Sequence, residues 1–382
     1  MAKIRTVLGD IAPEELGFCD MHEHTFTDMK AFKWKFPLSI PAMLGGIKNY
    51  QGGADLGEEG ERRKNLGIEP PTEQQDFSGV FSAFSIPKDS PVNQYSDMDL
   101  YTKELQEFKK YGGSAMCDCS PSMRGDDSQL IELSKAAGIH IIGTKGYYTK
   151  VFISKRDLKK GQQYMTDQLV EYAKNGDGKT DMRPGFLKCA VSVVDKQGNV
   201  CLEEMTAVRA TAAAARLSGL PVHIHTQFPL RPAHIETVAD VLEHEVGIDP
   251  DRVLFCHMDG TSTSAAARIN EFGFDQEFLM RLCDRGFHLG IDTWGTKRGL
   301  DEDPEYQIQL RLNILNEMAK AGYADKMTLG CDVMSKLNTT ICGEYGYTLH
   351  PRYTRSLVER GYLSEELYHQ VTVTNPASFM SI

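Results

Sequence analysis

Histidines, a lysine and an aspartate stand at or near the ends of short apolar segments that are spread over the whole chain. His22 and His24 lie at and just after the end of segment 16–22, with one residue between them. Residues two apart on a strand point to the same side, so these two imidazoles can bind one ion together. The other candidates are Lys188, His225, His257 and Asp332. Imidazole and carboxylate groups bind zinc and similar divalent ions, so the pattern predicts a metal centre.

The number of candidate ligands favours two ions, because a single tetrahedral ion needs only four. Two cations roughly 3.5–4 Å apart require an anion between them, and together they could lower the pKa of a shared water to give a bridging hydroxide near neutral pH. A lysine ammonium has no lone pair, so Lys188 can be a ligand only after its amine has added carbon dioxide to form a carbamate. In the alternative interpretation Lys188 extends to a nearby carboxylate and has a structural role.

Eight short apolar segments, each followed by a polar loop and a helical stretch, predict the strands of a parallel sheet. They are residues 16–22, 113–120, 140–146, 185–192, 221–226, 252–257, 287–292 and 327–332. Residues 99–113 and 202–219 are predicted helices with apolar residues three and four apart. Eight such units predict a distorted (β/α)8 TIM barrel of class α/β, with its active site at the carboxyl ends of the strands. A doubly wound open sheet is the second choice, since no glycine-rich phosphate loop follows the first strand.

Residues 28–94 interrupt this alternation and are rich in glycine, proline and charge. We interpret them as a long insertion after the first strand that lies over the barrel mouth, either as a lid or as a surface excursion. The residues before Leu16 are expected to form a short hairpin or cap. We predict one barrel domain that spans residues 1–382.

The composition narrows the class of protein. Hydrophobic residues make up 41% and charged residues 25% of the chain, as in ordinary globular proteins. No apolar run reaches the roughly 18–20 residues of a membrane span, and the first residues lack a signal peptide core, so we expect a cytoplasmic protein without a membrane partner. A net charge of −11 without a long basic run argues against nucleic acid as a partner.

The nine cysteines are scattered and mostly lie in apolar segments, which favours buried reduced thiols over disulfides. Cys189, Cys256 and Cys331 each stand next to a candidate ligand, so strand alternation predicts that they face the helices. Cys117 and Cys119 share a face of the second strand, and we prefer core packing to a metal pair for them.

In their joint order along the chain, these segments resemble the phosphotriesterase family of the amidohydrolase superfamily. The similar stretches include "GFCDMHEHTF", "GIHIIGTKGYY", "PVHIHT", "VLFCHMD" and "AGYADKMTLGCDVMSK". The resemblance implies a binuclear centre, with the first metal bound by His22, His24 and Asp332, the second by His225 and His257, and carboxylated Lys188 between them. It also implies that Asp332 takes the proton from the attacking hydroxide, while the second metal polarises the C=O or P=O bond. Zinc is the expected metal, with manganese, cobalt and iron as alternatives, and the resemblance suggests a homodimer.

The substrate pocket is less defined by the sequence. Lys145 is inserted before the Gly-Tyr of the third strand and could bind an anionic group of the substrate or pair with a carboxylate. Tyr148, Arg231 and Trp294 follow strand ends, so each could line the pocket or be a loop residue without such a role.

Two residues near the ligands are assigned other roles. His223 stands deeper in the fifth strand than His225 and is expected to be a hydrogen-bonded core histidine. Glu23 lies between two ligands and by alternation points away from the ions, as a partner between layers.

Three functions agree with such a site. The first hypothesis is a metal-dependent hydrolase of lactones or other carboxylic esters, with organophosphorus esters as further substrates. The second keeps the site but cleaves a cyclic amide or an N-acyl compound. The third is a non-catalytic metal-loaded binding barrel, which does not explain why all six candidate ligands are present. We therefore expect an enzyme that acts on a small-molecule ester or lactone.

Overall fold

The structure is a computed structural model that describes residues 2–26, 97–121, 127–180, 182–192, 194–195, 197–226, 230–264, 267–295, 304–333, 339–340 and 345–382. The expected insertion at residues 28–94 lies outside the described residues. Within the described ranges no helix is long and apolar enough to cross a lipid bilayer.

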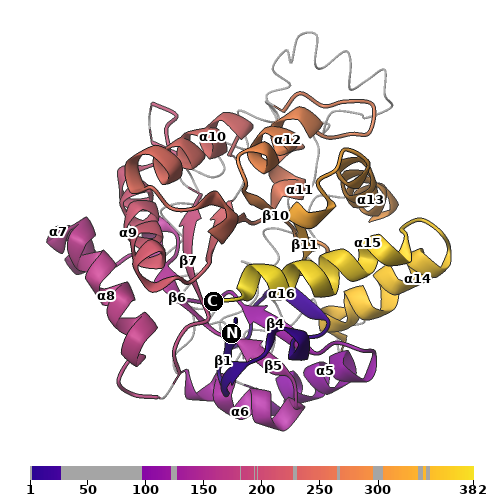
Figure 1. The fold of residues 1–382 in the computed structure, drawn as a ribbon, viewed down its shortest axis with the longest axis horizontal. Coiled ribbons are helices and arrows are strands. Elements are labelled where there is room, and N and C mark those ends of the chain that lie inside the picture. Colours follow the sequence, from indigo (N-terminus) through magenta and orange to yellow (C-terminus); the bar gives the residue numbers. More distant parts are fainter. Residues whose placement is uncertain are drawn as a thin grey trace, which may run out of the picture.

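Parallel strands form the centre of the described fold (Figure 1). They belong to two sheets, with the strand orders β3-β4-β5 and β11-β10-β9-β8-β7-β6. Their bounds are β3 (Cys19–Glu23), β4 (Ala115–Asp118), β5 (His140–Ile142), β6 (Thr144–Tyr147), β7 (Phe186–Val191), β8 (Val222–Thr226), β9 (Val253–Phe255), β10 (His288–Ile291) and β11 (Met327–Leu329). Each of the eight predicted segments overlaps such a strand, with β3 and β6 each ending one residue later than predicted, which confirms the strand predictions.

The predicted strand at 140–146 joins the two sheets. It is divided at Gly143 into β5, which pairs with β4, and β6, which pairs with β7. A Cβ at Gly143 would lie 2.9 Å from the sulfur of Met182, so the chain passes close to its neighbour where the pairing changes. One continuous segment therefore supplies a strand to each sheet.

β11 and β3 meet at the other seam and close the barrel. The backbone N–H of Asp332 donates a hydrogen bond of 2.8 Å to the carbonyl of His22. A Cβ added to Gly330 would lie 2.7 Å from the Cβ of His22, so glycine is required for this close approach. The protein is thus a (β/α)8 barrel, as predicted, with a distorted seam.

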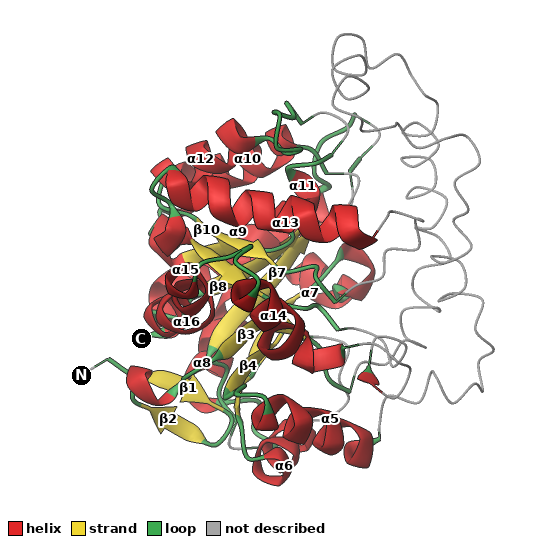
Figure 2. Ribbon diagram, turned by 90° about the vertical axis from the view of Figure 1, so that its right-hand side faces the viewer, coloured by secondary structure: helices red, strands yellow, loops and turns green. Residues whose placement is uncertain are grey.

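Helices surround the strands (Figures 1 and 2). The helices are α5 (Met98–Lys110), α6 (Ser128–Ala137), α7 (Lys155–Lys160), α8 (Gln162–Asn175), α9 (Leu202–Ser218), α10 (Pro232–Asp240), α11 (Met258–Thr261), α12 (Gln276–Asp284), α13 (Pro304–Lys320), α14 (Arg355–Glu359), α15 (Glu365–His369) and α16 (Asn375–Met380). Short 3-10 or π turns are η1 (Pro13–Glu15), η3 (Lys150–Phe152), η4 (Val241–Val246), η5 (Pro250–Arg252), η6 (Ala324–Lys326), η9 (Gly346–Thr348), η10 (His350–Thr354) and η11 (Gln370–Thr374).

The two helices predicted by apolar spacing are both present. α5 begins after Asp97, whose side chain accepts a hydrogen bond of 3.1 Å from the backbone N–H of Leu100 and so caps the helix. α9 ends at Gly219, which has a φ of 76° and stops the helix in the left-handed conformation. Its buried alanines let α9 pack closely against α8 and β7.

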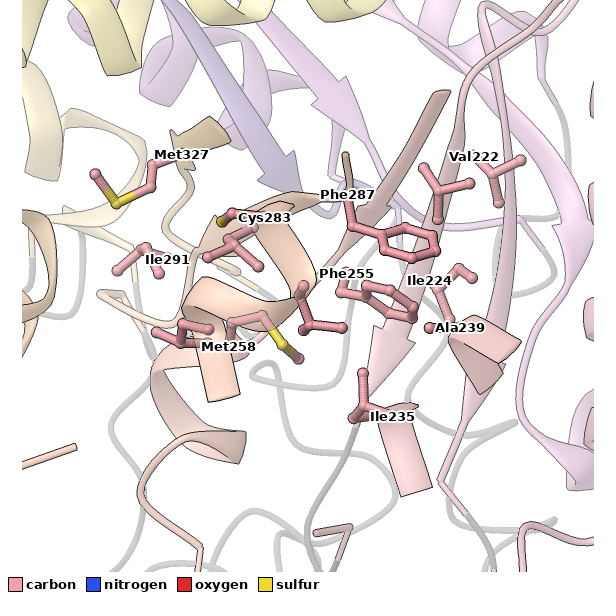
Figure 3. Packing of buried hydrophobic residues seen from close by; sticks show 14 of the residues in the cluster. Val222, Ile224, Ile235, Ala239, Phe255, Met258, Cys283, Phe287, Ile291 and Met327 are labelled. Atoms are coloured by element: carbon pink, nitrogen blue, oxygen red, sulfur yellow. The ribbon is translucent and has the colours of Figure 1, made fainter. Parts of the chain in front are cut away.

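A continuous apolar layer lies between strands β8 to β11 and the helices outside them. Val222 and Ile224 of β8 pack there with Phe255 of β9 (Figure 3). The rings of Phe255 and Phe287 lie with their centroids 5.1 Å apart. Because such interiors are packed as densely as organic crystals, this layer fixes the positions of the strand ends.

The amino ends of the strands are covered by both ends of the chain. The first residues form the predicted hairpin, with β1 (Ile4–Thr6) antiparallel to β2 (Gly9–Ile11). The backbones of Lys3 and Ile382 exchange two hydrogen bonds of 3.1 and 2.8 Å. The ring of Phe379 in α16 packs on His223 and His288 at the starts of β8 and β10. The polar strand ends therefore open on the opposite side.

Candidate metal centre

Three of the predicted ligands meet where β3 ends beside the end of β11. One donor atom each from His22, His24 and Asp332 lies within 4.8 Å of the others, and all three side chains are buried. Oδ1 of Asp332 is 3.2 Å from Nε2 of His24 and 3.7 Å from Nε2 of His22. Such a set of two imidazoles and one carboxylate matches a divalent metal site.

The second predicted pair comes from the end of β8 and the turn after β9. Nε2 of His257 lies 2.9 Å from Nδ1 of His225. The rings of His257 and His22 have centroids 4.7 Å apart, which joins this pair to the first group. The hydroxyl of Tyr148 is 3.3 Å from Nδ1 of His225, so it borders the same space.

Lys188 of β7 projects into the middle of these groups. Its side chain is fully buried, and its Nζ lies 2.8 Å from Nε2 of His22. The amine thus lies against an imidazole nitrogen, and the thiol of Cys119 contacts it as well. The alternative in which Lys188 extends to pair with a carboxylate does not describe this contact. The six predicted ligands therefore converge on one space.

Asp292, the last residue of the predicted strand 287–292, holds two of the imidazoles. Its Oδ2 is 2.7 Å from Nδ1 of His22, and its Oδ1 is 2.8 Å from Nδ1 of His257. The backbone N–H of His257 also donates to it, over 2.7 Å. The sequence reasoning missed this residue, although an acidic residue at the end of the seventh strand was a signal of the same kind as the ligands.

The ionisation states suit metal binding. Burial lowers the pKa of His22 to about 3, and the charge of Lys188 adds to this effect. Burial opposes the ionisation of Asp332, but contacts with His24 and His22 hold its pKa below the usual value. Burial likewise opposes the ionisation of Asp292, yet His257 and His22 keep its pKa well below the usual value. At neutral pH, Nδ1 of His22 therefore donates to Asp292 and Nε2 keeps a lone pair, as a metal ligand requires.

Two of the ligands have a left-handed backbone. The φ angles are 61° for His257 and 55° for Asp332, in a region that residues other than glycine rarely adopt. Strained residues of this kind collect at functional sites, where surrounding structure maintains them. At His257 the turn redirects the side chain. Regular alternation after Phe255, which packs on the helix side, would have placed His257 on that side too.

The same turn explains one wrong prediction. Cys256 does not face the helices, because it packs with Met21, Cys117 and Leu254 in a cluster drawn from strands on different sides of the barrel. Cys189 lies as predicted, since its thiol contacts Thr211 in α9. Cys117 is also as predicted, with its sulfur 3.8 Å from that of Met21 in the core.

Of the residues proposed to bind substrate, the structure brings Tyr148 to the centre. Lys145 forms an ion pair with Asp127, and its Nζ lies 3.8 Å from Oδ2 of Asp177. This contact agrees with the alternative in which Lys145 pairs with a carboxylate. The two further candidates stay predictions. Arg231 is exposed before α10, and the indole N–H of Trp294 donates a 3.0 Å hydrogen bond to the carbonyl of Ile291.

His223 and Glu23 take the roles predicted for them. His223 is buried below the centre, with Nδ1 3.8 Å from the sulfur of Cys119 and its ring against Phe186. Oε2 of Glu23 accepts a hydrogen bond of 2.8 Å from the backbone of Val333 and so joins β3 to the segment after β11.

The chain is similar to known proteins over nearly its whole length. The N-acetyltaurine hydrolase of Salmo salar is 24% identical over 390 residues, which cover 99% of this chain and 98% of that protein. The structure of a resiniferatoxin-binding protein from Rhodobacter sphaeroides has a TM-score of 0.71 at 24% identity and covers 99% of this chain and 94% of its own. A lactonase from Listeria monocytogenes has a TM-score of 0.66 at 18% identity, with coverages of 99% and 98%.

These similarities extend over the whole barrel. The profile of the phosphotriesterase family matches residues 2–380, which include all six convergent ligands. The order of the ligands along the strands and the match over the whole barrel agree with each other. The chain therefore belongs to the phosphotriesterase family.

Proposed function

We propose that this protein is a binuclear metal-dependent hydrolase that cleaves the ester bond of a lactone or another carboxylic ester, with organophosphorus esters as further substrates. The observation that supports this most is the position of Lys188, a buried amine 2.8 Å from Nε2 of His22, between both groups of ligands. A carbamate formed on this amine would supply the anion that two neighbouring cations need.

The chain's own groups suit this reaction. Bound divalent ions, with zinc as the first choice and manganese, cobalt or iron as alternatives, would acidify a water molecule and polarise the scissile bond. Asp332 is ionised and can accept the proton that water releases when it adds to the carbonyl carbon. Burial raises the pKa of Tyr148 well above its usual value, so its hydroxyl stays protonated and can donate to an oxygen of the reacting group.

A second candidate is hydrolysis of an N-acyl amide. It is favoured by the full-length similarity to a protein named N-acetyltaurine hydrolase. An amine leaving group must be protonated as it departs, and Asp332 could return the proton that it has accepted. Both candidates use the same centre and differ in the bond that is cleaved.

A substrate panel separates the two candidates. The metal-loaded protein should be assayed with lactones, aryl esters, organophosphorus esters and N-acyl amino compounds, and we expect the highest kcat/KM for a lactone or carboxylic ester. A higher value for N-acyl compounds would favour the second candidate. No turnover of any class would favour a binding barrel instead.

The bridging role of Lys188 can be tested apart from the substrate. Lys188→Ala should lose metal from the purified protein together with its activity, because the two groups of histidines would lack an anion between them. Lys145→Ala is the matched control, since Lys145 pairs with Asp127 and Asp177 outside the centre. Unchanged metal content in Lys188→Ala would contradict the carbamate bridge.

A further inference from the structure

A second group of metal-binding side chain types lies behind the first, on the helix side of β3 and β11. Asp20 belongs to β3, Cys331 follows β11, and His350 begins η10 outside the strands. One donor atom from each lies within 4.8 Å of the others, and all three side chains are at most 1% exposed. Carboxylate, thiolate and imidazole together are ligands of zinc-type ions.

Each polar side chain in this group has one atom that makes a hydrogen bond and a second buried atom that makes no regular hydrogen bond among the described residues. Oδ1 of Asp20 accepts from the backbone N–H of His22 over 3.1 Å, while among the described residues Oδ2 has no regular hydrogen bond. The same carboxyl group contacts Glu23 and both the thiol and the backbone of Cys331. Glu23, which is fully buried beside Asp20, uses Oε2 for Val333 and leaves Oε1 without a donor. Buried polar atoms without a partner are rare in proteins, so two neighbouring carboxylate oxygens need an explanation.

His350 follows the same pattern. Its Nδ1 lies 3.0 Å from the hydroxyl of Thr354, while within the described structure Nε2 forms no regular hydrogen bond and the ring also contacts the backbone of Gly330. When Nδ1 donates its hydrogen to Thr354, Nε2 carries a lone pair. A second contact that fixes the tautomer in this way is typical of metal-bound histidine.

The group also lies at the seam of the barrel. β3 and β11 belong to different sheets, and the backbone of Asp332 donates to His22 across the gap between them. Asp20 and Glu23 come from one side of this seam and Cys331 from the other. A cation held by all three would join the strands that carry His22, His24 and Asp332.

We propose that Asp20, Cys331 and His350, with Glu23 as a fourth donor, form a closed structural site for one zinc-type divalent cation, separate from the catalytic centre. Four protein ligands without solvent access are the pattern of structural rather than catalytic zinc. The ion would hold β3, β11 and η10 together and so fix the catalytic ligands that alternate with its own. This proposal does not depend on which bond the enzyme cleaves.

The competing explanation is that a proton, and not a cation, lies between the buried carboxyl groups. Burial raises the pKa of Asp20 to about 7, and burial together with the charge of Asp20 raises that of Glu23 well above its usual value. The two carboxyl groups could then share one proton in place of a cation. This alternative leaves the His350 ring with its contacts to Thr354 and the backbone of Gly330, whereas a cation would also be bound by the imidazole.

Cobalt spectroscopy of the whole protein tests the proposal. The six predicted ligands of the catalytic centre offer nitrogen and oxygen atoms, whereas the proposed site adds the sulfur of Cys331. Because the thiol of Cys119 contacts Lys188, the variants below decide which thiol a cobalt–thiolate band comes from. Protein expressed in cobalt-supplemented medium should contain about three metal ions per chain and show a thiolate-to-Co(II) charge-transfer band in the near ultraviolet. About two ions and no such band would overturn the proposal in favour of the shared proton.

Variants assign the band to its residue. Cys331→Ser and His350→Asn should each lose about one metal ion per chain, and the charge-transfer band should vanish in the first and lose most of its intensity in the second. Cys189→Ser is the matched control, because Cys189 is equally buried beside Lys188 but contacts Thr211. This variant should keep the third metal ion and the charge-transfer band. A band that persists in Cys331→Ser would overturn the assignment. If Cys331→Ser fails to fold, the band and stoichiometry of the unmodified protein still decide.

Discussion

A single carboxylate, Asp292, positions two imidazoles of the candidate metal centre that come from different strands. It accepts hydrogen bonds from Nδ1 of both His22 and His257 and leaves their Nε2 atoms to face the centre. Carboxylates of this kind fix the ring orientation and increase the basicity of the ligand. We therefore expect the affinity of the proposed centre for metal to depend on a residue that would not touch the metal.

Asp292→Asn should weaken metal binding. The amide has one oxygen for two imidazole N–H donors and places an NH2 group against one of them, so we expect a loss of about 10–100-fold in metal affinity. Competition with a metal chelator measures this affinity. Asp251→Asn is the control, because Asp251 pairs with Nε2 of His288 at 3.0 Å, away from the centre, and should leave the affinity unchanged. Equal affinities in both variants would contradict the role of Asp292.

Buried thiols give a test that depends on pH. Burial raises the pKa of Cys283 in α12 from its ordinary value to about 12, so the reactive thiolate is scarce at pH 8. Alkylation of the native protein at Cys283 should speed up about tenfold for each pH unit between 7.5 and 9.5. Peptide mass spectrometry after timed alkylation measures the rate. The protein unfolded in urea is the control, and a native rate that levels off near pH 8.5 would contradict the shift.

At the scale of elements, the strands were predictable because apolar residues repeat at regular intervals and polar residues mark the strand ends. The six ligands followed from the same marks, since parallel strands bring their carboxyl ends together. The orientation of Cys256 could not be predicted, because His257 leaves the regular strand conformation with a φ of 61°. Asp292 could have been found by asking for a carboxylate at every strand end, including strands without a histidine.

The seam between β3 and β11 predicts a sensitive glycine. Gly330→Ala would place a Cβ 2.7 Å from that of His22, so the strands must separate, and we expect a loss of about 1–3 kcal/mol in the free energy of unfolding. Gly219→Ala is the comparison, since its Cβ meets nothing within 4 Å and only the left-handed backbone resists it. Urea unfolding of both variants measures the difference. An equal or smaller effect at Gly330 would contradict the close approach.

For the whole molecule, the burial of the proposed ligands predicts that metal binding and folding are linked. A ligand that binds the native state alone stabilises it by about 2.7 kcal/mol when its concentration is 100 times its Kd. Removal of metal by a chelator should therefore lower the Tm, and added zinc should restore it. Differential scanning calorimetry measures both steps. A Tm that does not change on metal removal, with metal loss verified by elemental analysis, would contradict the linkage.

The hydrogen bonds between Lys3 and Ile382 make the barrel suitable for circular permutation. Lys3 and Ile382 are hydrogen-bonded to each other at the amino ends of the strands, on the side away from the catalytic ligands. A short linker could join them into a ring, and the ring could be reopened at an exposed turn on the same side. Circular permutants of this enzyme should thus be accessible, with the catalytic face left as it is.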